Sequence, residues 1–144
     1  MASRFSIAES DISPDLVPDT HWEQLRTDPD TGEVATVLEI VEPAEDLFVA
    51  ECGGMFTAAA NITLAKPQVL NVVIWQAHYR RAAGTSDYQI PDDVAKAKEA
   101  AMTWARTTGK ALLAQEGNVD PPGAGGVEYD APTANFTTTK LDNL

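Results

Sequence analysis

The sequence has one cysteine and two histidines, and these shortages exclude several kinds of site. Cys52 has no second cysteine to pair with, so an internal disulfide is excluded and a reducing compartment is expected. A zinc site on His21 and His78 would need further ligands, and a single thiol cannot complete it. We therefore predict no metal site and no cofactor.

Basic residues are also scarce. Ten lysines and arginines face 22 acidic residues, which gives a net charge of −12. A nucleic-acid-binding protein needs the opposite balance, because contacts with phosphates supply most of its affinity. An acidic surface would instead let DNA pass without adhering, since like charges repel.

Long apolar runs are missing as well. No stretch approaches the roughly 20 apolar residues that a membrane-spanning helix needs. The first residues, Met1 to Ser6, lack the apolar core of a signal peptide. We therefore expect that the protein does not associate with a membrane and that it is made in the cytoplasm.

Catalytic motifs are not found either. The sequence has no Gly-x-Ser-x-Gly elbow and no glycine-rich loop followed by lysine and threonine. Asp28, Asp30 and Glu33 do not match a calcium loop, because the glycine comes one position early. Cys52 lies next to Gly53 at an expected helix end, where a small packed residue is typical. We predict no catalytic residue and no enzymatic activity.

With 144 residues, of which 44% are hydrophobic, the chain can form one globular domain. We expect an all-α fold, a small helical bundle over residues 19–117. An extended N-terminal arm, residues 1–18, precedes it, and a long extended C-terminal tail, residues 118–144, follows.

The first half of the expected bundle holds two helices. A short helix is predicted over 20–26, with Asp19 or Thr20 as its cap, followed by a turn over 28–32. Apolar residues at helical spacing predict a second helix over 34–52. Pro43 should kink this helix or make it restart, and Gly53 with Gly54 should end it.

The second half holds two longer helices. One should begin with Pro67 in its first turn, end at Gly84, and be buried, because it is apolar on nearly every face. The other is predicted over 91–116, although Gly109 weakens its continuity. Two of the three tryptophans, Trp75 and Trp104, are expected in the core. The last helix should pack through a stripe of small and apolar residues: Val94, Ala97, Ala101, Trp104, Ala105, Thr108 and Leu112.

Charges are unevenly spread along the chain. Five acids of the second helix are expected on a solvated face: Glu39, Glu42, Glu45, Asp46 and Glu51. Six of the ten basic residues lie between Arg80 and Lys110. This separation suits head-to-tail contact between identical subunits, and it fits ordinary packing within one chain equally well.

The tail keeps apolar residues although no core is available to cover them. Such segments often order on a partner, commonly by adding a strand to its sheet. We predict that the partner-binding residues are Val127, Tyr129, Phe136 and Leu141.

Several of these features resemble one family. The turn Leu25-Arg26-Thr27-Asp28 matches its opening pattern. Glu42 with Ala44-Glu45-Asp46, then Gly53 or Gly54 and Phe56, matches its second element. Pro67 through Tyr79-Arg80-Arg81 matches the third, and a later helix with Trp104 and Gly109-Lys110 is similar in style. Over residues 19–116 the chain resembles the head-tail connector (adaptor, or head-completion) proteins of tailed bacteriophages.

The resemblance implies a structural protein of the virion neck. Such a protein forms a ring, expected to hold twelve copies, beneath the portal protein, extends the DNA channel without sequence-specific binding, and contacts the next neck or tail-completion protein. The tail would reach the portal. The alternative is a small acidic regulatory or inhibitor protein that binds a basic partner through its glutamate-rich helix.

Overall fold

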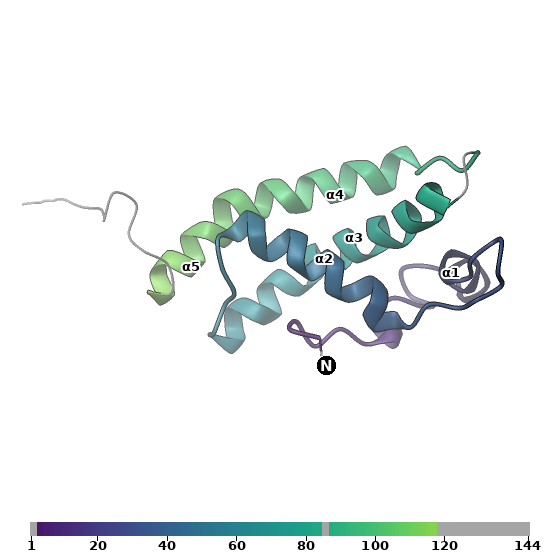
Figure 1. Cartoon of the computed structure of the whole chain (residues 1–144). Helices are drawn as coiled ribbons and strands as arrows, with labels where there is room; N and C mark the ends of the chain where they lie inside the picture. The colour runs from purple at the N-terminus through teal and green to yellow at the C-terminus, as the bar shows by residue number, and fades with distance from the viewer. Residues whose placement is uncertain (1–2, 85–86, 118–144) are drawn as a thin grey trace, which may run out of the picture.

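The structure is a computed structural model that describes residues 3–84 and 87–117. Over these residues it is helical and contains no strand, which confirms the all-α prediction (Figure 1). The elements are the short 3-10 helix η1 (Glu9–Asp11), α1 (Asp19–Arg26), α2 (Val37–Cys52), α3 (Ala59–Gly84), α4 (Asp92–Trp104), the π-helical turn η2 (Ala105–Gly109) and α5 (Lys110–Glu116).

The longest helix, α3, lies at the centre of the arrangement. It packs against α2 and against α4, while α1 lies at its carboxyl end (Figure 1). Val69, Val72, Val73 and Ala77 are fully buried, as the apolar character of this segment predicts. α4, η2 and α5 follow one another directly, so the polypeptide from Asp92 to Glu116 runs back along α3.

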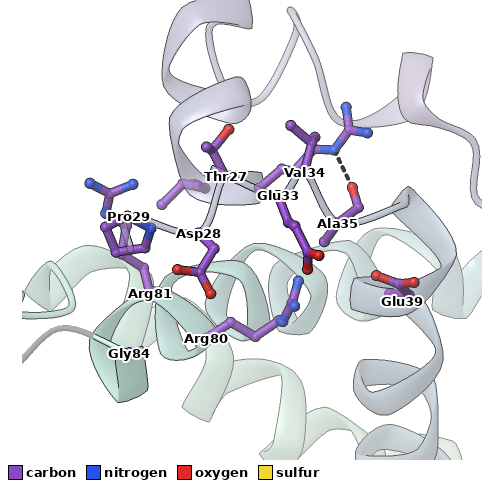
Figure 2. A pocket seen from close by; sticks show the side chains of 12 residues that line it. Thr27, Asp28, Pro29, Glu33, Val34, Ala35, Glu39, Arg80, Arg81 and Gly84 are labelled. Carbon is purple, nitrogen blue, oxygen red and sulfur yellow. Dashed lines mark hydrogen bonds between the residues drawn. The ribbon is translucent and has the colours of Figure 1, made fainter. Parts of the chain in front are cut away.

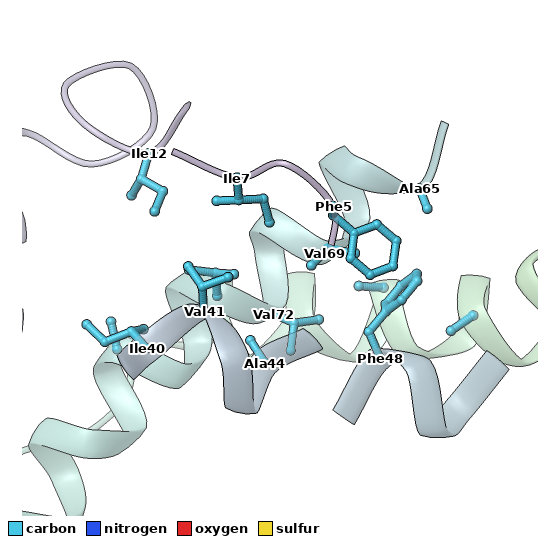
Figure 3. Close-up of a cluster of buried hydrophobic side chains, with 14 of the residues drawn as sticks. Phe5, Ile7, Ile12, Ile40, Val41, Ala44, Phe48, Ala65, Val69 and Val72 are labelled. Carbon is cyan, nitrogen blue, oxygen red and sulfur yellow. The ribbon is translucent and has the colours of Figure 1, made fainter. Parts of the chain in front are cut away.

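The N-terminal segment is not the extended arm that the sequence suggested. Residues 3–18 contain η1 and bury four apolar side chains: Phe5, Ile7, Ile12 and Val17. Figure 3 shows Phe5, Ile7 and Ile12 directed toward apolar residues of α2 and α3. The Phe5 and Phe48 rings meet edge to face, with centroids 5.7 Å apart. The segment is therefore part of the core, and it resembled an arm because its apolar residues follow no helical period.

α2 begins three residues later than predicted and runs through Pro43 without a restart. Its start is fixed by a capping box, in which the Thr36 hydroxyl accepts from the Glu39 amide and the Glu39 carboxylate accepts from the Thr36 amide. Pro43 leaves the Glu39 carbonyl without its backbone donor, but Glu39 is exposed, so water can satisfy that carbonyl. Gly53 ends the helix in a left-handed conformation (φ 94°), as predicted.

α3 extends one and a half to two turns further toward the N-terminus than predicted. Pro67 lies inside the helix rather than in its first turn. The carbonyl that loses its donor belongs to Thr63, which is exposed together with Pro67, so the helix tolerates the proline. The backbone amides of the two residues before the helix bind a carboxylate that is distant in the sequence. Glu116 of α5 accepts from the Thr57 and Ala58 amides at 2.8 and 3.2 Å.

The last predicted helix has the expected extent, and η2 interrupts its regular winding. Gly117 ends it with φ 76°. Because a π-turn shifts the helical register, the buried stripe passes through Gly109 and Leu113 and leaves Thr108 exposed, contrary to the predicted stripe. The predicted limits of the bundle and the tail stay predictions, and residues 118–144 lie outside the described residues.

Candidate protein-interaction surface

An open, largely apolar groove lies between α2 and α3. α2 contributes Pro43, Asp46, Leu47 and Ala50, and α3 contributes Trp75, Gln76 and Tyr79. Its volume is about 490 Å³. Exposed large apolar side chains grouped in one hollow are typical of protein-binding surfaces. We call this site the α2–α3 groove.

Two aromatic rings form one wall of the α2–α3 groove. Trp75 and Tyr79 are one helical turn apart and stack with centroids 5.0 Å apart and planes inclined by 18°. The Lys98 ammonium lies 4.5 Å from the Trp75 ring centre and adds a cation–π contact. Tyr79 is 48% exposed and Leu47 39%. This wall is therefore held in place before any partner arrives, which lowers the ordering cost of binding.

The position of Trp75 corrects a prediction. Trp75 is only half-buried, and Trp104 is half-buried at the margin of the core, stacked on Phe48. The fully buried tryptophan is Trp22 of α1, whose indole N–H donates to the Glu9 carboxylate at 3.0 Å. The spacing of Trp75 and Tyr79 showed that they share a helix face. Because α3 is apolar on nearly every side, the sequence did not show that this face is open.

One acid of α2 departs from the predicted solvated face, and most of the others also have partners within the chain. Glu45 is fully buried, and its carboxylate accepts from the Arg4 and Phe5 amides at 3.2 and 3.1 Å. Asp46 pairs with the Arg4 guanidinium, and Glu51 pairs with Arg106 at 3.0 Å. With Glu39 engaged in the capping box, four of the five acids act within the chain. Glu45 and Asp46 hold the N-terminal segment against α2, and Glu51 holds η2 to it. Glu39 caps the start of α2 itself.

A second hollow, of about 300 Å³, lies between the turn after α1 and the carboxyl end of α3 (Figure 2). It brings together two sequence features: the Leu25–Asp28 turn and the Arg80-Arg81 pair near the end of α3. Asp28 accepts from the Asp30 and Thr31 amides, and these hydrogen bonds lower the pKa of its carboxyl group.

Opposite charges are present together in this second hollow. Three basic residues and three acidic residues line it: Arg26, Arg80 and Arg81, with Asp28, Glu33 and Glu39. Arg81 also donates to the Gln24 carbonyl of α1, which ties α1 to α3. A hollow with balanced charges offers no excess positive potential for an anionic ligand. Its contacts join the two sequence features into one structural junction.

The thiol of Cys52, the side chain considered above as a possible catalytic residue, is shielded from solvent. Cys52 is 1% exposed, and burial, with the charge of Glu51 adding to it, raises the pKa of its thiol to about 11, while Lys110 opposes this rise. The thiol therefore stays protonated at neutral pH and behaves as a small core residue.

The two histidines lie beside each other where α1 packs against α3. His78 is buried, at 3% exposure, and its ring lies 5.6 Å from that of His21. Within residues 3–84 and 87–117, no three histidine, cysteine or acidic side chains are grouped so that they could hold a metal ion. The predicted partner-binding residues Val127, Tyr129, Phe136 and Leu141 lie outside the described residues.

Comparison of the chain with models of known protein families, with curated proteins and with solved structures finds no match. None of the helices in the described part of the chain has the length and apolar character needed to cross a membrane.

Proposed function

We propose that this protein is a structural adaptor of a tailed-phage neck. It forms a ring beneath the portal, extends the DNA channel and links the head to the tail-completion proteins. The proposal rests on the sequence resemblance and on one structural observation: an open, pre-formed apolar groove that a protein partner can cover. A groove with exposed Leu47 and Tyr79 suits a contact between proteins.

The occupant that we assign to the α2–α3 groove is a second copy of this chain. The groove is lined by side chains of α2 from Pro43 to Ala50 and of α3 from Trp75 to Tyr79, so it opens on the side of these two helices. A side-facing contact that repeats around an axis closes a ring. The separation of acids and bases along the chain suits such a contact between identical subunits, and it also fits packing within one chain.

The alternative function, a regulator that binds a basic partner through α2, receives less support. Glu39, Glu45, Asp46 and Glu51 already have partners within the chain. A basic partner would have to displace these contacts, at a cost of stability to the regulator itself. The glutamate-rich sequence of α2 is explained by intramolecular contacts.

The remaining part of the proposal concerns the tail and the DNA. Val127, Tyr129, Phe136 and Leu141 would anchor the chain on the portal, and the acidic balance would let DNA pass through the channel. The next neck or tail-completion protein would bind the ring on its far side. In this assignment the groove and the tail have different partners, so they can be tested separately.

The test uses purified protein with and without purified portal. Size-exclusion chromatography with light scattering and negative-stain electron microscopy should show a ring, formed alone or on the portal. Tyr79→Glu places a charge in the α2–α3 groove and should prevent ring formation. Leu64→Glu is the matched control, because Leu64 is also an exposed residue of α3 (55%) but does not line the groove.

Deletion of residues 118–144 separates the two contacts. The truncated protein should keep the circular dichroism of the helical fold and lose portal docking. A full-length protein that stays monomeric with and without portal would contradict the proposed function. Equal loss of ring formation in Tyr79→Glu and Leu64→Glu would contradict the assignment of the groove.

A further inference from the structure

A buried histidine lies where three parts of the chain meet. His78, on α3, is 3% exposed and faces His21 of α1, with ring centroids 5.6 Å apart. Its Nδ1 atom lies 2.5 Å from the Tyr88 hydroxyl, and the two rings stack at 5.9 Å. Tyr88 belongs to the connection that leads from α3 to α4. His78 therefore contacts α1 on one side and the start of the α4 region on the other.

The charged groups around His78 come from every neighbouring element. α1 contributes His21, α4 contributes Asp93, and α3 itself contributes Arg81, whose guanidinium lies 5.8 Å from the Tyr88 ring centre. Tyr88 contributes a hydroxyl whose pKa is raised by burial, against the effect of Arg81, so it stays neutral. Asp93 is the acidic group that acts on His78, and His21 is the basic group that acts on it.

We propose that His78 makes the contact between α1 and α3 sensitive to protons, so that its protonation releases α1 and the following turn from the carboxyl end of α3. This inference does not depend on the proposed function. The proposed switch operates within one chain, where α1 and the turn after it meet the carboxyl end of α3.

The cost of protonation follows from burial. Burial lowers the pKa of His78 below its usual value of 6.5, His21 lowers it further, and Asp93 partly opposes them. In the released state His78 is in water and regains its usual pKa. Below about pH 6.5 the released state therefore binds a proton that the packed state does not, and the packed state loses stability as the pH falls.

α1 is the element that should move, because it is shorter than α2 and meets α3 less extensively, although its Trp22 and Leu25 side chains are buried in the core. Its polar contacts with α3 are the His21–His78 ring contact and the hydrogen bond from Arg81 to the Gln24 carbonyl. α2 instead meets α3 through a continuous apolar contact that includes Val41, Phe48 and Val69, none of which titrates. Acid should therefore loosen α1 while α2 stays packed.

Hydrogen exchange with mass spectrometry on the full chain tests the proposal. Exchange of α1 amides, corrected for the pH dependence of intrinsic exchange, gives the opening constant of this helix. One linked proton raises that constant by up to about tenfold per pH unit. Because the released His78 is already half protonated at pH 6.5, we expect a rise of up to about fivefold between pH 6.5 and 5.5 in α1, with no rise in α2. In His78→Gln the rise should vanish, since the amide can still bond Tyr88 but does not titrate there.

Three further variants keep the test decisive if His78→Gln does not fold. His21→Gln removes the neighbouring cation, so the pKa of His78 should move back toward 6.5 and the rise should shrink. Asp93→Asn removes the opposing anion, so the rise should continue to lower pH, whereas Asp92→Asn, its neighbour on α4, should leave the profile unchanged. An acid-induced rise of equal size in α1 and α2, or an unchanged profile in both His21→Gln and Asp93→Asn, would overturn the proposal.

Discussion

Gly109 of η2 lies directly against Cys52 at the end of α2: a β-carbon added at Gly109 would lie 2.7 Å from the Cys52 sulfur. The same added atom would lie 3.4 Å from the Trp104 ring. The end of α2 can therefore approach η2 only because position 109 has no side chain. This contact explains both a glycine inside a helical run and the burial of the single cysteine.

Gly109→Ala should destabilise the protein. Real β-carbons essentially never approach a neighbour as closely as 2.7 Å, so either η2 or the end of α2 must shift. Overpacking of a core costs about 1–3 kcal/mol, more than the roughly 1 kcal/mol that alanine gains over glycine in a helix. Urea unfolding followed by circular dichroism measures the change in the free energy of unfolding.

Gly84→Ala is the matched control, because no atom lies within 4 Å of a β-carbon there. It should be neutral or slightly stabilising. Cys52→Ala should recover part of the loss in the Gly109→Ala background, since it removes the clashing sulfur. Additive effects of the two substitutions would show that the clash is not the cause.

The Cys52 thiol should be unreactive in the folded protein. Its pKa of about 11 leaves little thiolate at pH 8, and the sulfur is buried. Ellman's reagent should modify it only at the rate of unfolding, and at once in denaturant. Rapid modification of the native protein at pH 8 would show that the end of α2 opens readily.

Glu45→Gln should detach the N-terminal segment. The two oxygens of the buried carboxylate accept from two backbone amides. A glutamine has one oxygen, so its NH2 group would face an amide N–H or one hydrogen bond would be lost. We expect a loss of about 2–3 kcal/mol in stability and faster proteolysis within residues 3–17. Glu42→Gln, one turn earlier and half-buried, should stay within about 0.5 kcal/mol of the unmodified protein. Similar losses for both substitutions would argue against the anchoring role of Glu45.

Glu116 should contribute stability only above its titration range. Burial acts to raise the pKa of its carboxyl group, but hydrogen bonds from Thr57, Asn61 and Ala58 together lower it below the usual 4.5. The unfolded chain then binds the proton first, so this stability is present above about pH 4.5 and is lost as the pH falls through the native pKa. Unfolding between pH 6 and 3 should show a smaller acid loss in Glu116→Gln. An identical loss in both proteins would contradict the capping role.

The sequence predicted those elements whose limits are set by local chemistry. Gly53 and Gly117 end their helices because each adopts a positive φ that glycine favours. The turn at Asp28 follows from its carboxylate, which binds the next backbone amides. These contacts involve residues close in the sequence, so their residue types are sufficient to predict them.

The errors arose where distant residues decide the structure. The start of α3 depends on Glu116, more than fifty positions away, so Pro67 was taken as the helix start. The burial of Glu45 depends on amides of the N-terminal segment, which no pattern within α2 reveals. The α2–α3 groove was missed for the same reason, since only the packed helices show which face of Trp75 and Tyr79 stays open.

The central claim, a structural role in a phage neck, is tested most directly by immunogold electron microscopy. Phage particles from the lysate of the source are labelled with antibody against this protein, after a control that shows the epitope is accessible in assembled particles. The account predicts gold at the head–tail junction. Particles without gold, or with gold elsewhere, would contradict it.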